Sequence, residues 1–109
     1  MLALPGSPRI FVYQDSTHMG KGFEGLCTLI DQHFPEPVTS GAFFVFLNRT
    51  RDRMKVLYWD NDGLALWYKR LEQGRFPLNK NHQIAMNRRD FLMLLEGIVP
   101  MRKHKRFSL

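Results

Sequence analysis

Most of the side chains that could bind an anion lie in three stretches of the chain. The first runs from Asn48 to Lys55, the second from Lys69 to Arg75, and the third, from Arg102 to Arg106, contains no acid. The cations in these stretches are Arg49, Arg51, Arg53, Lys55, Lys69, Arg70, Arg75, Arg102, Lys103, Lys105 and Arg106. Cations beside phosphates release condensed counterions, so these stretches predict salt-dependent binding of nucleic acid. The alternative, that turns and chain ends simply carry solvated charges, stays open at this point.

The positive charge is unevenly distributed along the chain. The 109 residues include 16 Lys and Arg against 10 Asp and Glu, for a net charge of +6. Four of the cations lie in the stretch 102–106, so the rest of the chain is close to neutral. A basic chain favours an anionic partner without identifying it. The nucleic-acid hypothesis therefore depends on a few local clusters rather than on the overall charge.

Side chains suited to catalysis are scattered. His18, His33, His82 and His104 lack the spacing of zinc ligands, and the single Cys27 excludes a cysteine-rich zinc site or an internal disulfide framework. Asp60 and Asp62 could share a metal ion, but Asp is also locally favoured in a turn such as 60–63. We therefore expect no metal, no cofactor and no catalytic residue. A small basic nuclease remains the alternative, with Asp60, Asp62, His82 and Arg53 as its candidate residues.

Two aromatic pairs could contribute to binding. Tyr58-Trp59 and Trp67-Tyr68 could stack on bases. The same residues are also typical of a core or a protein interface, and we favour that interpretation.

Helical periodicity appears at both ends of the chain. After a short predicted strand at Arg9 to Tyr13, apolar residues at Phe23, Leu26, Cys27 and Ile30 predict a helix over about 19–33, with Thr17 as its N-cap. Near the C-terminus, Asn87 is expected to cap a second helix over about 87–97.

The middle of the chain has the pattern of strands. Ala42 to Leu47 is apolar, and a polar turn at 48–52 separates it from a second strand at Arg53 to Trp59. The turn at 60–63 leads into Leu64 to Glu72, which fits a helix or a third strand; the turn favours the strand. We predict an α+β fold with a small antiparallel sheet, a hairpin or meander over about 42–72, and the two helices.

Length and hydropathy set the class of protein. A chain of 109 residues fits a single domain, expected over 1–101, with 102–109 as a basic tail. The sequence lacks the apolar stretch of a signal peptide and any run long enough to span a membrane. A cytoplasmic protein is the expectation. The free edges of the predicted strands also allow a homodimer.

Several motifs together resemble one family of proteins. They are Met19-Gly20-Lys21-Gly22-Phe23-Glu24-Gly25-Leu26, Phe44-Val45-Phe46, Asp52-Arg53-Met54-Lys55-Val56-Leu57-Tyr58-Trp59-Asp60, Asp62-Gly63-Leu64, Tyr68-Lys69-Arg70-Leu71-Glu72, Gly74-Arg75-Phe76 and Leu94-Leu95-Glu96-Gly97-Ile98. In this order they closely resemble the second open-reading-frame protein (TnpB) of the IS-sixty-six group of bacterial insertion sequences. The resemblance covers nearly the whole chain. Two positions depart from the family pattern: His18 stands where an acid is usual, and Gly20 stands where an Arg is usual.

The resemblance implies an accessory protein of transposition that works beside a larger, catalytic transposase. It implies no catalytic residues for this chain. The expected partners are DNA at the ends of the insertion sequence and the transposase itself. Two alternatives stay open: the small nuclease described above, and a protein-interaction module that never touches DNA.

Overall fold

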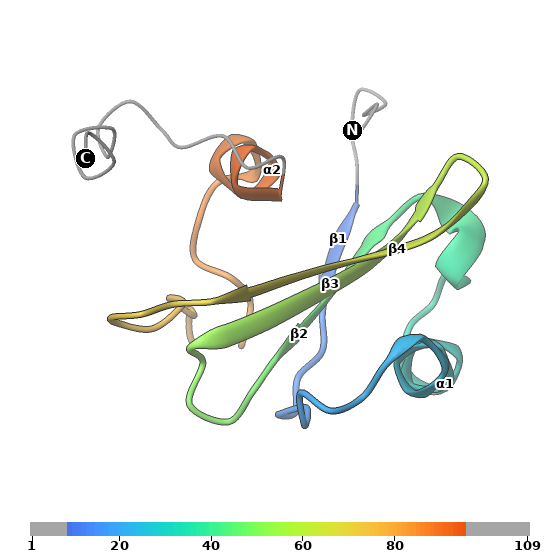
Figure 1. The fold of residues 1–109 in the computed structure, drawn as a ribbon. Helices are drawn as coiled ribbons and strands as arrows, with labels where there is room; N and C mark the ends of the chain where they lie inside the picture. The colour runs from blue at the N-terminus through green and yellow to red at the C-terminus, as the bar shows by residue number, and fades with distance from the viewer. Residues whose placement is uncertain (1–8, 96–109) are drawn as a thin grey trace.

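A computed structural model describes residues 9–95 of the chain. Its elements are β1 (Ile10–Val12), α1 (Phe23–His33), the 3₁₀ turn η1 (Val38–Ser40), β2 (Phe43–Leu47), β3 (Arg53–Asp60), β4 (Gly63–Arg70) and α2 (Arg88–Leu95). The strands form one sheet in the order β1-β2-β3-β4 (Figure 1). The small α+β fold expected from the sequence is therefore confirmed.

The sheet is mixed rather than purely antiparallel. Strands β2, β3 and β4 form the predicted meander, and the ambiguous segment at 64–72 is largely strand β4. Strand β1 pairs in parallel with β2, Ile10 lying opposite Phe43. A parallel neighbour requires a long crossover connection, which α1 provides. The sheet is thus one parallel strand larger than the predicted one.

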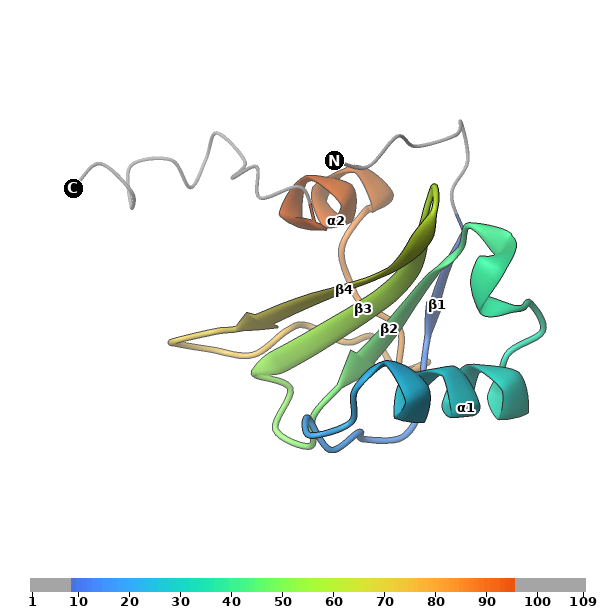
Figure 2. The ribbon, with the colours of Figure 1, turned by 45° about the vertical axis from the view of Figure 1, so that its right-hand side comes forward.

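Helix α1 lies over one face of the sheet and α2 over the other (Figure 2), and an apolar layer fills the space on each side. On one face, Leu26 and Ile30 of α1 pack against Phe44, Phe46 and Leu57. On the other face, Phe91 and Leu95 of α2, together with the segment 71–86, pack on the opposite side chains of β2 and β3. All five residues of β2 are buried. A strand covered on both faces is apolar along its whole length, and this explains the continuous run at 43–47.

Helix α1 begins later than predicted. Its N-cap is Gly22, and Thr17 does not cap it. The Thr17 amide instead donates to the Leu47 carbonyl oxygen at 2.8 Å, which holds the connection after β1 against the end of β2. Residues 18–22 therefore form a loop between this contact and the helix.

Helix α2 follows the prediction where it is described. Asn87 Oδ1 accepts a hydrogen bond of 2.7 Å from the Asp90 amide, as expected of an N-cap. The predicted end of this helix, near residue 97, and the basic tail 102–109 lie outside the described residues. Over residues 9–95, no helix combines the length and the apolar character needed to cross a membrane.

Candidate nucleic-acid interface

Six of the predicted cations lie at one end of the sheet. The β2–β3 turn carries Arg49 and Arg51, and the antiparallel register places Arg53 opposite Arg70 and Met54 opposite Lys69. The Phe76 amide donates to the Arg51 carbonyl oxygen at 2.7 Å, which brings Arg75 beside the same turn. We call this part of the molecule the basic end; it comprises Arg49, Arg51, Arg53, Lys69, Arg70 and Arg75. Side chains alternate along a strand, so Arg53 and Arg70 point to one face of the sheet and Lys69 to the other. The fold thus joins two clusters that are separate in the sequence.

The β2–β3 turn is held by side-chain hydrogen bonds. Asp52 Oδ1 accepts from Asn48 Nδ2 at 2.7 Å and from the Thr50 hydroxyl at 2.8 Å. Asn48 Oδ1 in turn accepts from the Arg53 amide at 2.9 Å. The hydrogen bond from Asn48, followed by that from Thr50, lowers the pKa of Asp52 from its ordinary value of 3.8. The ionised carboxylate therefore fixes the turn that carries Arg49 and Arg51.

Arg51 is anchored on both its backbone and its side chain. Its φ of 59° lies in the left-handed region, which is uncommon for a residue other than glycine. Besides the carbonyl contact to Phe76, its guanidinium Nη1 donates to the Phe76 carbonyl oxygen at 3.4 Å. These contacts tie the segment after β4 to the β2–β3 turn.

Lys55 differs from the other predicted cations because it is buried, with only 7% of its surface exposed. Its Nζ donates to the carbonyl oxygens of Met19, at 2.7 Å, and Lys21, at 2.8 Å. The ammonium also lies 4.9 Å from the centre of the Tyr68 ring. Lys55 therefore joins the 18–22 loop to the sheet instead of presenting its charge on the surface.

An open groove lies between that loop and the basic end. It measures about 580 Å³ and is lined by residues 16–20 on one side and by Asn48, Arg49, Thr50, Arg53 and Tyr68 on the other. We call it the Tyr68 groove. Arg49 and Arg53 form no salt bridge with a described residue. Thr17, on the loop side, is buried, and its hydroxyl oxygen has no hydrogen-bond partner within residues 9–95.

The two positions that depart from the family pattern are in contact with each other in this groove. The Gly20 amide donates to His18 Nδ1 at 3.0 Å. A Cβ at position 20 would lie 2.9 Å from the same nitrogen, so a larger residue there requires the His18 ring to move. The sequence identified both positions but gave no sign that they face each other, because residues two apart in a loop have no fixed relative orientation.

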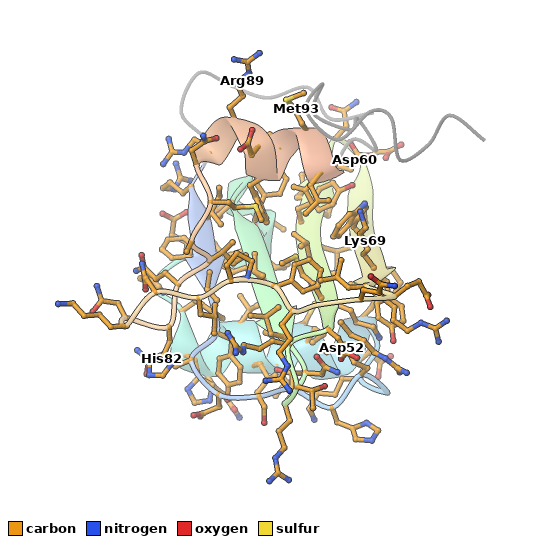
Figure 3. The ribbon with its side chains drawn as sticks, turned by 90° about the vertical axis from the view of Figure 1, so that its left-hand side faces the viewer. Asp52, Asp60, Lys69, His82, Arg89 and Met93 are labelled. Carbon is orange, nitrogen blue, oxygen red and sulfur yellow. The ribbon has the colours of Figure 1, made fainter. Side chains whose placement is uncertain are left out.

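The candidate residues of the nuclease alternative do not come together. Asp60 and Asp62 lie at the β3–β4 turn, and Arg53 lies at the opposite end of β3. A strand of this length spans roughly 24 Å. His82 lines a second groove, near Arg49 and Arg51, and lies far from Asp60 (Figure 3). Within residues 9–95, no group of three His, Cys, Asp or Glu side chains could hold a metal ion.

The four aromatic candidates divide between core and surface. Tyr58 packs edge-on against Phe43 with ring centres 5.2 Å apart, and Trp67 packs against the same apolar layer. Trp59 and Tyr68 remain 38% and 49% exposed. Both exposed rings lie on the α1 face of the sheet, at opposite ends of it. Only Tyr68 is next to the cations of the basic end.

Comparison with known proteins places this arrangement in a family. The sequence model of a family described as "IS66 Orf2 like protein" matches residues 8–105. The chain belongs to the IS66 Orf2-like family. The match extends across both helices, the whole sheet and most of the C-terminal stretch, so the resemblance inferred from the motifs is confirmed.

Two relatives of this IS66 Orf2-like protein come from Sinorhizobium fredii (strain NBRC 101917 / NGR234). The protein y4jC is 32% identical over 92 residues, covering 83% of this chain and 79% of the relative. The protein y4hO is 31% identical over 100 residues, covering 90% of this chain and 87% of the relative. Both are described as uncharacterised proteins. No solved structure matches the chain. The family makes this a protein associated with insertion sequences.

Proposed function

We propose that this IS66 Orf2-like protein is a non-catalytic accessory factor of transposition that binds DNA at the ends of its insertion sequence. The observation that carries the proposal is the basic end, where cations from the β2–β3 turn, β3, β4 and the segment after β4 gather at one end of the sheet. Several cations on one surface can neutralise neighbouring phosphates together. The nuclease alternative receives no comparable support, because its candidate residues lie apart.

A gel-shift titration against the terminal repeats of the element tests the proposal. Binding should weaken steeply between about 50 mM and about 200 mM salt, because each phosphate contact releases counterions. An Arg49→Gln, Arg75→Gln variant should lower the slope of log K against log salt by about 2, since B-DNA contributes about 0.9 per contact. Both side chains are exposed, so the fold should not change.

The matched control removes the same charge elsewhere. Arg88 and Arg89 lie on α2, away from the β2–β3 turn, and both are exposed. An Arg88→Gln, Arg89→Gln variant should keep the wild-type slope. Absence of binding at low salt, with or without transposase, would overturn the nucleic-acid proposal.

We also propose the transposase as a protein partner, supported by the exposed Trp59 and Phe23, at 38% and 45% exposure. Exposed aromatic side chains are enriched in protein interfaces. Tagged protein should retain transposase from a lysate treated with nuclease, and a Trp59→Ala, Phe23→Ala variant should retain less. Recovery of transposase only when the nuclease is omitted would mean that DNA alone connects the two proteins.

A further inference from the structure

The Lys55 side chain supports one face of the Tyr68 ring. The Lys55 ammonium lies 4.9 Å from the ring centre, and two backbone carbonyls fix that ammonium in turn. Lys55 is buried whereas Tyr68 is 49% exposed. The tyrosine thus stands on a strand of the sheet, supported on one ring face, and lines the groove with its remaining surface. An aromatic ring with fixed orientation is a suitable platform for stacking.

Cationic side chains stand beside this ring. Arg53 lies on the neighbouring strand β3 and points to the same face of the sheet as Tyr68, and Arg49 lines the groove from the turn. Neither arginine is neutralised by a salt bridge with a described residue. The ring and the two guanidinium groups therefore offer a stacking surface and phosphate ligands within one groove of about 580 Å³. That volume is in the range of about 300–1,000 Å³ found for small-ligand clefts.

We propose that the Tyr68 groove binds an unpaired nucleotide, whose base stacks on Tyr68 and whose phosphate is held by Arg49 and Arg53. The inference rests on the proposed function and goes beyond it, because it specifies an unpaired strand. In a duplex the faces of the bases are covered by their stacked neighbours, so a ring inside a groove has no base face to contact. An unpaired nucleotide of DNA or RNA offers both a free base face and a phosphate.

The buried Thr17 hydroxyl fits the same site. Its oxygen lacks a hydrogen-bond partner within the described residues, and Thr17 lines the groove. A buried hydroxyl without a partner carries a desolvation cost. The groove is therefore bordered by an unpartnered hydroxyl on the loop side and by arginines on the turn side.

Fluorescence anisotropy with labelled oligonucleotides tests the inference. The full-length protein is titrated with an oligothymidylate strand, an RNA strand of the same length and a duplex. A Tyr68→Leu variant keeps an apolar cover over Lys55 but has no ring, and should weaken single-strand binding by about 5- to 150-fold, the effect of losing one stacked base. Tyr68→Phe keeps the ring and should bind like the wild type. The thermal midpoint of each variant checks its fold.

Matched controls separate the site from general effects. Arg53→Gln should weaken single-strand binding, whereas Arg89→Gln, which removes the same charge from the exposed surface of α2, should not (Figure 3).

The outcomes distinguish this inference from the proposed function. If Tyr68→Leu and wild type bind single strands equally while duplex binding persists, the groove does not hold a nucleotide and the proposed function stands. If the wild type binds no nucleic acid at low salt, both proposals fall. Tighter, Tyr68-dependent binding of the DNA strand or of the RNA strand supports the inference and identifies which of the two occupies the groove.

Discussion

The contact of Lys55 with the Met19 and Lys21 carbonyl oxygens joins two of the motifs that characterise the sequence. Lys55 belongs to the motif at 52–60, and its acceptors belong to the motif at 19–26. One buried ammonium therefore positions the 18–22 loop against the sheet and supports the Tyr68 ring. Both sides of the Tyr68 groove therefore depend on Lys55, although Lys55 itself is buried.

Replacing Lys55 by Met should destabilise the protein. The change leaves two carbonyl oxygens without their charged donor, and a hydrogen bond to a charged group contributes about 1.5–3 kcal/mol. The free energy of unfolding, measured by urea denaturation, should fall by about that amount. Lys80 is exposed, so a Lys80→Met control should remain within about 0.5 kcal/mol of the wild type. Equal stability of the two variants would show that the contact contributes nothing.

Single residues show where sequence reasoning succeeds and where it stops. The cations at 49–53 and 69–75 were recognisable by residue type. Lys55 was grouped with them because the local sequence does not show that the distant loop at 18–22 buries it. The contact between His18 and Gly20 was not predictable for a related reason. Residue type gives the available chemistry, whereas the partner is fixed by the folded chain.

At the scale of elements, the β2–β3 turn is organised around one ionised carboxylate, that of Asp52. Asn48 and Thr50 donate to the Asp52 carboxylate, and these bonds lower the pKa of Asp52 from its ordinary value. A group with a lowered pKa in the folded state stabilises that state above its ordinary pKa, and the contribution is lost as the pH falls through the folded-state pKa. The turn should therefore be sensitive to acid.

An Asp52→Asn variant should be less stable than the wild type at neutral pH. The difference between their free energies of unfolding should begin to shrink as the pH falls below about 4, where the unfolded chain takes up a proton at Asp52. It should be lost once the pH is below the lowered pKa of the folded state, because both side chains are then uncharged. Denaturation series at several pH values measure this difference. Thr50→Val removes one donor to the carboxylate, and should shift the loss of stability toward higher pH. A difference that stays constant from neutral to acidic pH would contradict the argument.

The elements themselves were largely predictable. The apolar run at 42–47 and the turns at 48–52 and 60–63 identified the meander, and Asn87 identified the start of α2. The start of α1 was missed because Thr17 has the side chain of an N-cap. Its amide is instead used by the Leu47 carbonyl oxygen, a contact between residues 30 positions apart that no local pattern reveals.

At the scale of the whole molecule, the net positive charge of the meander is concentrated at one end, where Asp52 and Glu72 offset only part of it. The basic end lies at one end of the meander, and Asp60 and Asp62 lie at the other. A molecule with opposed charges is oriented by the field of a polyanion as it approaches. This arrangement favours an approach with the basic end foremost.

The C-terminal cations should add affinity without adding selectivity. Changing Arg102, Lys103, Lys105 and Arg106 together to Gln should lower the salt slope of duplex binding by up to about 0.9 per lost phosphate contact. The ratio of single-strand to duplex affinity should change little, because we attribute the preference for single strands to stacking on Tyr68. Gel shifts of the wild type and the variant at several salt concentrations measure both quantities. A lost single-strand preference with an unchanged slope would assign the selectivity to the C-terminal stretch instead.

The overall layering could not be derived from sequence. The parallel pairing of β1 with β2, and the burial of β2 between α1 and α2, both depend on contacts between segments far apart in the chain. Short apolar runs such as 10–12 and 43–47 indicate strands without indicating their neighbours.

The parallel pairing of β1 also has a consequence during synthesis. Ile10 pairs with Phe43, about 33 positions later in the chain. A ribosome adds roughly 5–20 residues per second, so β1 is made about 2 to 7 s before its partner strand. The β2–β3 and β3–β4 pairs, by contrast, join strands that follow each other directly in the chain. The first strand of the nascent chain is thus left without its partner until α1 and β2 have been translated.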